Sequence, residues 1–128
     1  MKKMNFVLIL LLPVFLVFTY CRHDESDFSN IEQVCFDPDV KAIFTANCAI
    51  SGCHSGSGGE AGFVLDNYQG IMKGISPGDP LKSEIYKAIT NEWFEMMPPD
   101  NPLNEQQRII IRIWIEQGAE NTNCSPGK

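Results

Sequence analysis

The chain has 128 residues and a formal net charge of −6, with 16 acidic side chains against 10 basic ones. This length allows one small domain behind a leader and is too short for two domains. The acidic balance excludes a nucleic-acid-binding protein, because contacts to phosphates require a basic surface.

The first 20 residues, 1–20, are typical of a secretory signal peptide. Two lysines precede an almost wholly apolar run over residues 6–18, which is shorter than the about 20 residues that a membrane-spanning helix requires. Charged residues begin just after Cys21, so we expect cleavage before Cys21 and attachment of lipid to its thiol. The mature chain then has 108 residues and a charge of −8. The alternatives are cleavage without lipid and an uncleaved membrane anchor.

Residues 21–34 form the predicted lipid-anchored tether. This segment is rich in acidic side chains and poor in apolar ones, so we expect it to be flexible. Its run Asp24-Glu25-Ser26-Asp27 resembles the export signal of some surface lipoproteins of Gram-negative bacteria. The predicted location is therefore the cell envelope of a Gram-negative bacterium, in the periplasm or on the outer-membrane surface.

The first predicted helix begins at Asp37-Pro38, where a capping side chain precedes a proline. Apolar residues recur at helical spacing after it, and the helix leads directly into Cys48. Residues 51–62 are rich in glycine and serine and have no hydrophobic period, which predicts a loop. A short helix is expected over residues 66–71, with Gly74 as its stop.

A further helix is predicted to start at Asp79-Pro80, because this pair repeats the earlier start signal. Residues 91–102 contain several prolines and predict an unusually apolar loop. The apolar stripe expected on the helix consists of Leu81, Ile85, Ala88 and Ile89.

The last element, over residues 104–117, fits both a strand and a helix by periodicity, because isoleucines alternate along part of it. Its ends favour a helix. Asn104 and Gln107 are spaced as a capping box, and Gly118 stands where a left-handed stop residue belongs. The fold class is therefore predicted as all-α, with about four helices over residues 35–124 and a tail over 125–128.

The most informative motif is the run CAISGCH over residues 48–54. A c-type haem is attached through two thiols, and a histidine directly after the second thiol becomes the proximal iron ligand. Cys48, Cys53 and His54 match this pattern, with four residues between the cysteines in place of the common two. Gly52 allows the backbone to bulge between them. The alternatives are a disulfide between the two cysteines and a zinc site that includes His54 and a carboxylate.

Five cysteines are present in the chain. If Cys21 carries lipid and two cysteines carry haem, Cys35 and Cys124 remain, and they flank the predicted helical domain. One disulfide between them would close a loop of nearly 90 residues. The alternative is that both are free buried thiols.

This pattern resembles the cytochrome c superfamily, and more closely the single-haem domains of exported lipoproteins. The resemblance spans Cys35 to Cys124 and implies a small cytochrome c-like fold with His54 as proximal ligand and Met97 as distal ligand. Met96 and Met72 are the competing candidates for the distal position. The residues that carry the resemblance are Ile43, Phe44, Asn47, Cys48, Gly52, Cys53, His54, Met97, Pro98, Pro99 and the run from Trp114 to Ala119.

The resemblance implies an electron carrier rather than an enzyme, with one covalent haem c. A haem held by His54 and Met97 has no open position for a substrate, and methionine ligation raises the reduction potential. We expect a redox partner protein with a basic docking patch, because this chain is acidic, and contact with the membrane through the lipid anchor. The alternatives are a haem-based peroxidase or gas sensor with a displaceable methionine, and a haem-free lipoprotein module with a disulfide between Cys48 and Cys53.

Overall fold

The computed structural model of the chain describes residues 31–56, 59–90 and 95–124. The predicted leader, Cys21 and the tail over 125–128 lie outside the described residues. The chain divides into two compact units after Ile31, and the second unit, from Glu32 onward, is the one described below. Among the described residues, none of the helices combines the length and the apolar character that crossing a membrane requires.

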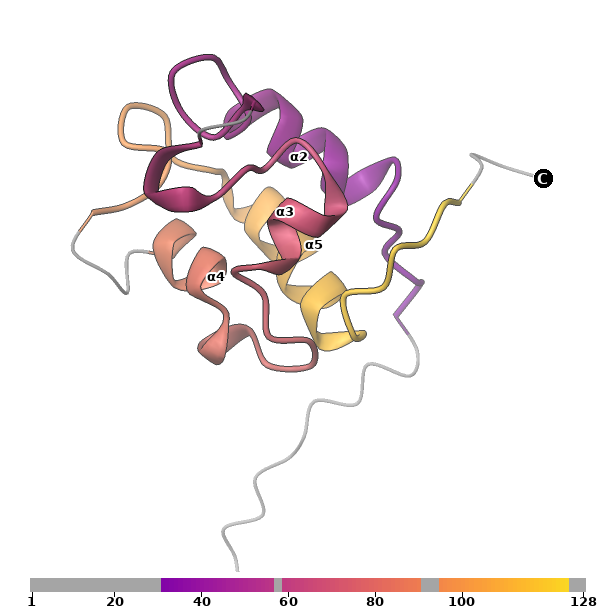
Figure 1. Cartoon of the computed structure of the whole chain (residues 1–128). Coiled ribbons are helices and arrows are strands. Elements are labelled where there is room, and N and C mark those ends of the chain that lie inside the picture. The colour runs from indigo at the N-terminus through magenta and orange to yellow at the C-terminus, as the bar shows by residue number, and fades with distance from the viewer. Residues whose placement is uncertain (1–30, 57–58, 91–94, 125–128) are drawn as a thin grey trace, which may run out of the picture. The chain divides into compact units, whose positions relative to one another are not determined.

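In the described part of the second unit there are four α-helices and two single turns of 3-10 helix (Figure 1). Within the described ranges the only strand-like pairing is an isolated bridge between Asp37 and Asn123. The prediction of an all-α fold is therefore confirmed. The elements are α2 (Asp39–Asn47), η3 (Glu60–Gly62), α3 (Tyr68–Met72), η4 (Pro80–Lys82), α4 (Glu84–Ile89) and α5 (Glu105–Glu116).

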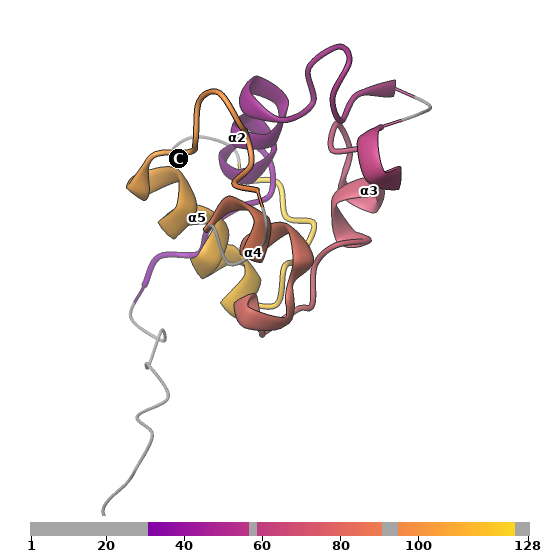
Figure 2. The same ribbon diagram turned by 90° about the vertical axis from the view of Figure 1, so that its left-hand side faces the viewer.

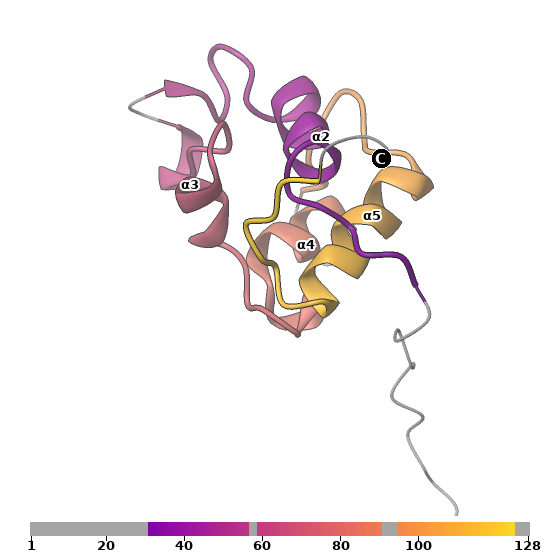
Figure 3. The same cartoon turned by 90° about the vertical axis from the view of Figure 1, so that its right-hand side faces the viewer.

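The core forms where α5 packs against α2 and α4 (Figures 1 and 3). Helix α2 contributes Val40 and Phe44, and both side chains are fully buried. Helix α5 contributes Trp114 and Ile115, which are buried to the same degree. Burial of large apolar side chains such as these is the main favourable term for so small a domain. Helix α2, which leads into the sequence motif, is thereby fixed against α5.

Helix α5 has the ends that its sequence predicts. The Asn104 side chain accepts a hydrogen bond from the Gln107 amide, the Gln107 side chain accepts one from the Asn104 amide, and Gly118 has φ of 98° after the last turn. The alternative of a strand is wrong, because Ile109 is 46 % exposed whereas Ile111 is fully buried. Residues two positions apart would share one face of a strand.

The start of α2 differs from its prediction. Pro38 occupies the N-cap position, and no side chain caps the helix. The Asp37 carboxylate instead pairs with Lys41 at 2.9 Å, on the solvent side. The Asp37 backbone is bound elsewhere, since its amide donates to the Thr122 carbonyl and its carbonyl accepts from the Cys124 amide. A long-range contact has therefore displaced the local capping signal.

The helix predicted from Asp79 is divided in two. The Asp79 side chain caps η4, and α4 begins only after Ser83, which is fully buried. Leu81 falls in the 3-10 turn and is 64 % exposed, so its predicted place in the apolar stripe is wrong. Gly74 does not act as a left-handed stop. A Cβ atom there would lie 2.7 Å from Ile85, so the glycine permits close packing of α4.

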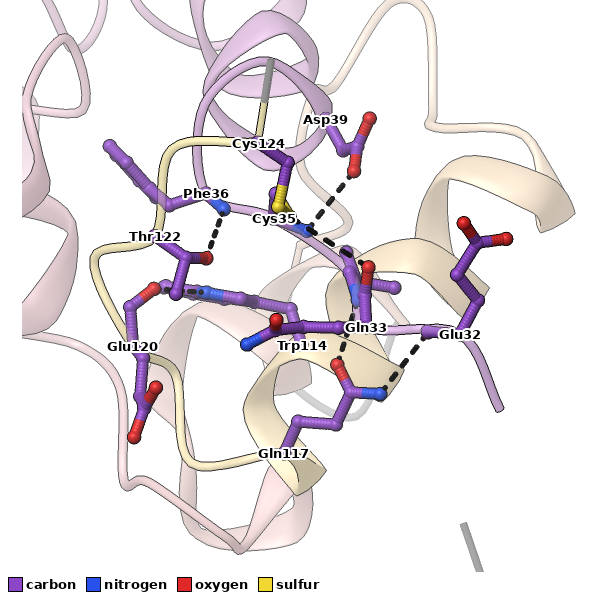
Figure 4. Close-up of a disulfide and its surroundings, with 11 residues drawn as sticks. Glu32, Gln33, Cys35, Phe36, Asp39, Trp114, Gln117, Glu120, Thr122 and Cys124 are labelled. Carbon is purple, nitrogen blue, oxygen red and sulfur yellow. Dashed lines mark hydrogen bonds between the residues drawn. A yellow bond between two sulfur atoms is a disulfide. The ribbon is translucent and has the colours of Figure 1, made fainter. Parts of the chain in front are cut away.

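Residues 119–124, which we call the C-terminal strap, run back along the start of the domain (Figures 3 and 4). Cys35 and Cys124 are joined in a disulfide with Cα atoms 5.9 Å apart, which is the pairing that the cysteine count favoured. The Phe36 amide donates to the Thr122 hydroxyl at 3.2 Å. The indole nitrogen of Trp114 donates to the Glu120 carbonyl at 3.0 Å, which fixes the strap to the core.

The residues just before Cys35 are also bound to the domain, through the side chain of Gln117. The Val34 amide donates to the Gln117 side chain at 2.9 Å, and the same side chain donates to the Glu32 carbonyl at 3.3 Å (Figure 4). These residues belong to the segment 21–34 that the sequence assigns to the tether. The end of α5 therefore also binds the backbone of the chain just before Cys35.

Candidate functional site

The motif loop, residues 48–56, begins where α2 ends. The Cys48 amide continues the helix by donating to the Phe44 carbonyl at 2.9 Å. The Cys53 amide donates to the Ile50 carbonyl, and the His54 amide donates back to the Cys48 carbonyl at 3.2 Å. Two successive turns therefore bring both cysteines and the histidine into one short loop.

The two cysteines of the motif loop are free thiols. Cys48 is 7 % exposed, whereas Cys53 is half-buried. Burial, and to a smaller extent the nearby Cys53, raises the pKa of the Cys48 thiol to about 11. The structure has no disulfide between Cys48 and Cys53, so that alternative is not supported. The other two cysteines in the described part, Cys35 and Cys124, do form a disulfide.

The His54 ring is held by a backbone carbonyl. Its Nδ1 atom lies 3.1 Å from the Phe63 carbonyl oxygen. A carbonyl oxygen only accepts hydrogen bonds, so Nδ1 carries the proton in this contact, and the lone pair of the neutral ring is then on Nε2. The Leu65 amide also donates to the His54 carbonyl at 2.8 Å. This is the arrangement in which a histidine presents Nε2 to a metal.

Met97 is fixed separately from the motif loop. Its amide donates to the Ala88 carbonyl at 2.9 Å, which ties the loop before α5 to α4. Met96 and Met97 are both half-buried, whereas Met72 lies at the end of α3 and packs against the hydrophobic core. The motif loop and the segment after Met97 lie at the same end of the domain, on either side of α2 (Figures 2 and 3).

The donor set fits a haem better than a metal bound by protein side chains alone. Among residues 31–56, 59–90 and 95–124, no group of three or more His, Cys, Asp and Glu side chains is placed to hold a metal ion, so the zinc alternative has no support. A porphyrin supplies four nitrogen ligands, and iron then needs only axial ligands from the protein. The oriented imidazole of His54 matches that requirement, and the two free thiols match the thioether attachment of a c-type haem.

Phe63 is a residue of the candidate site that sequence reasoning missed. It acts through its carbonyl oxygen, which every residue type carries, so no side-chain pattern marks it. The glycines near it, Gly59 and Gly70, carry a clearer signal. Neither glycine has the positive φ that would explain its residue type. Instead, the backbone of residues 63 and 64 passes so close to both that a side chain would not fit.

Residues 51–101 match the model of a family described as Planctomycete cytochrome C. No curated protein and no solved structure matches the chain. The matched stretch is less than half of the chain, begins after Cys48, and contains Cys53, His54 and Met97. Together with the small all-α fold, this match supports a cytochrome c-like family for the chain.

Proposed function

We propose that this protein is a c-type cytochrome domain that holds one haem covalently and transfers single electrons in the cell envelope. The observation that carries the proposal is the motif loop, where two reduced thiols lie beside a histidine whose Nδ1 is bound and whose Nε2 is left for a metal. The family match over residues 51–101 supports it independently.

Each protein group has a distinct role in this proposal. Cys48 and Cys53 would hold the porphyrin through thioether bonds, and His54 would bind the iron through Nε2. Met97 would supply a thioether sulfur as the second ligand, and such a soft ligand favours the ferrous state. The bound haem supplies the exchange of one electron between ferrous and ferric iron. The chain would orient His54 and Met97 and exclude water.

Covalent attachment is tested with protein made in a host that matures c-type cytochromes. We expect the wild type to retain haem on a denaturing gel and to give the alkaline-pyridine spectrum of two thioether bonds. Cys48→Ala and Cys53→Ala each leave one thioether, which moves the spectrum toward longer wavelength. Cys35→Ala, the matched control from the other cysteine pair, retains both. A wild-type mass equal to the bare polypeptide contradicts the proposal.

The distal ligand is tested by the far-red absorption of the oxidised protein. A sulfur-to-iron charge-transfer band is expected in the wild type and in Met96→Ala, and it disappears in Met97→Ala. Loss of the band in Met96→Ala alone assigns the ligand to Met96. A high-spin spectrum of the wild type supports a haem-based peroxidase or gas sensor, because the iron then has an open position.

The acidic surface and the leader define the expected surroundings of the protein. Residues 1–20 would direct export, and a lipid on Cys21 would hold residues 21–34 and the domain at the membrane. Net negative charge would favour a redox partner with a basic docking patch, since complementary charge raises the rate of encounter. Electron transfer to such a partner then slows as ionic strength rises, and an unchanged rate in stopped-flow measurements argues against this partner.

A further inference from the structure

Two glycines occupy positions where the backbone does not require glycine. Gly59 has φ of −47° and ψ of 143°, an extended conformation that any residue adopts. Gly70 lies inside α3, where glycine is less favourable than alanine because it loses more conformational entropy. Both residues are buried. Their identity therefore calls for another physical reason.

The reason is the close approach of the segment 63–65. A Cβ atom on Gly59 would contact the Phe63 carbonyl oxygen, far inside van der Waals distance. A Cβ atom on Gly70 would contact the Val64 carbonyl oxygen in the same way, and it would lie 2.9 Å from the carbonyl carbon. Both obstacles are backbone atoms, which cannot rotate away as a side chain can.

The same segment holds His54 at two points. The Phe63 carbonyl accepts the hydrogen bond from Nδ1 of the ring, and the Leu65 amide donates to the His54 carbonyl. The Val64 peptide groups lie between these two contacts. A displacement of either carbonyl by a methyl group is thus transmitted directly to the backbone and ring of His54.

We propose that Gly59 and Gly70 are positioning residues for His54, because their missing side chains let the Phe63 and Val64 carbonyls approach and so fix the direction of Nε2. The inference rests on the proposed function for its redox consequence. A strong hydrogen bond from Nδ1 makes the imidazole a better electron donor to a metal on Nε2, and this stabilises the oxidised state. Weakening the bond therefore raises the reduction potential.

The variants are Gly59→Ala and Gly70→Ala, made in the full chain with haem maturation. The matched control is Gly78→Ala. Gly78 is exposed, has φ of 80°, and donates through its amide to the Ile115 carbonyl, so alanine there strains a turn without touching the segment 63–65. Redox titration gives the potential, and NMR of the reduced protein gives the shift and exchange rate of the His54 Nδ1 proton.

We expect both variants to show a more positive potential, an upfield Nδ1 proton and faster exchange of that proton, whereas Gly78→Ala loses stability and keeps the wild-type values. Unchanged values in Gly59→Ala and Gly70→Ala overturn the proposal. Failure of both to fold while Gly78→Ala folds also overturns it, because the glycines then serve overall stability. A wild type without haem rejects the proposed function instead, and the Nδ1 proton of the isolated chain still tests the positioning role.

Discussion

The two cysteine pairs of this domain have opposite chemical states. Cys35 and Cys124 are 89 positions apart in the sequence and form a disulfide, whereas Cys48 and Cys53 are close neighbours and remain thiols. The first pair lies where backbone and side-chain hydrogen bonds already hold two chain segments together. The second pair lies within one short loop, and both of its side chains are free thiols. Distance along the sequence therefore does not decide which cysteines pair.

The two regions also differ in what holds them in place. The C-terminal strap is bound at several points to residues far away in the sequence, including the Phe36 amide and the Tyr68 hydroxyl, which donates to the Ala119 carbonyl at 2.8 Å. The motif loop is held by turns within itself and by the segment 63–65. The strap thus ties the two ends of the domain together, and the motif loop keeps both of its cysteines as free thiols.

Removing the disulfide is the largest expected change. In the double variant Cys35→Ala/Cys124→Ala the unfolded chain regains the freedom that the cross-link removed, which costs up to about 4 to 5 kcal/mol of stability by the chain-entropy model. Urea denaturation with circular dichroism measures this loss. The haem content is expected to stay at the wild-type level. A variant as stable as the wild type contradicts the role assigned to the strap.

The second largest expected effect is the pH dependence of stability that comes from the Cys48 thiol. It applies to protein made without haem maturation, in which this thiol is free. An unfolded thiol ionises near pH 9 and the buried one near pH 11, so the unfolded state releases its proton first as pH rises. The free energy of unfolding keeps the full contribution of the protonated, buried thiol below pH 9. It falls by about 2 to 3 kcal/mol as the pH rises to 11.

The matched comparison for this pH effect is Cys48→Ala, which lacks the thiol and is expected to lose that part of the pH dependence. Urea denaturation at intervals between pH 8 and 11 measures both proteins. Haem-loaded chain lacks the effect as well, since a thioether sulfur holds no proton. Identical pH profiles for the haem-free wild type and Cys48→Ala show that the thiol is not buried as described.

Gln117→Ala gives the smallest effect of the three. The variant removes one side chain that binds Val34 and Glu32, and each such hydrogen bond contributes about 1 kcal/mol or less at a partly exposed site. Faster amide exchange is expected at Val34. The control is Gln106→Ala, an exposed residue of the same helix, where a change within about 0.5 kcal/mol is expected. Equal effects at both positions would show that the hydrogen bonds of Gln117 to Val34 and Glu32 do not stabilise the domain.

Local signals in the sequence determined the elements and the site motif. The capping box at Asn104 and the apolar period behind it specify α5 within a few residues, because capping and amphipathicity involve neighbours along one helix. The adjacency of Cys53 and His54 likewise identifies the candidate site, since both groups lie on one short stretch of chain.

Tertiary structure decided what depends on distant backbone. Asp37 does not cap α2, because residues of the strap bind its amide and carbonyl. Leu81 is exposed, because buried Ser83 separates η4 from α4. The Phe63 carbonyl meets His54 only after the chain has returned past the motif loop. Such contacts join groups that every residue carries, so the side-chain pattern of a sequence does not encode them, and only the folded path of the chain brings them together.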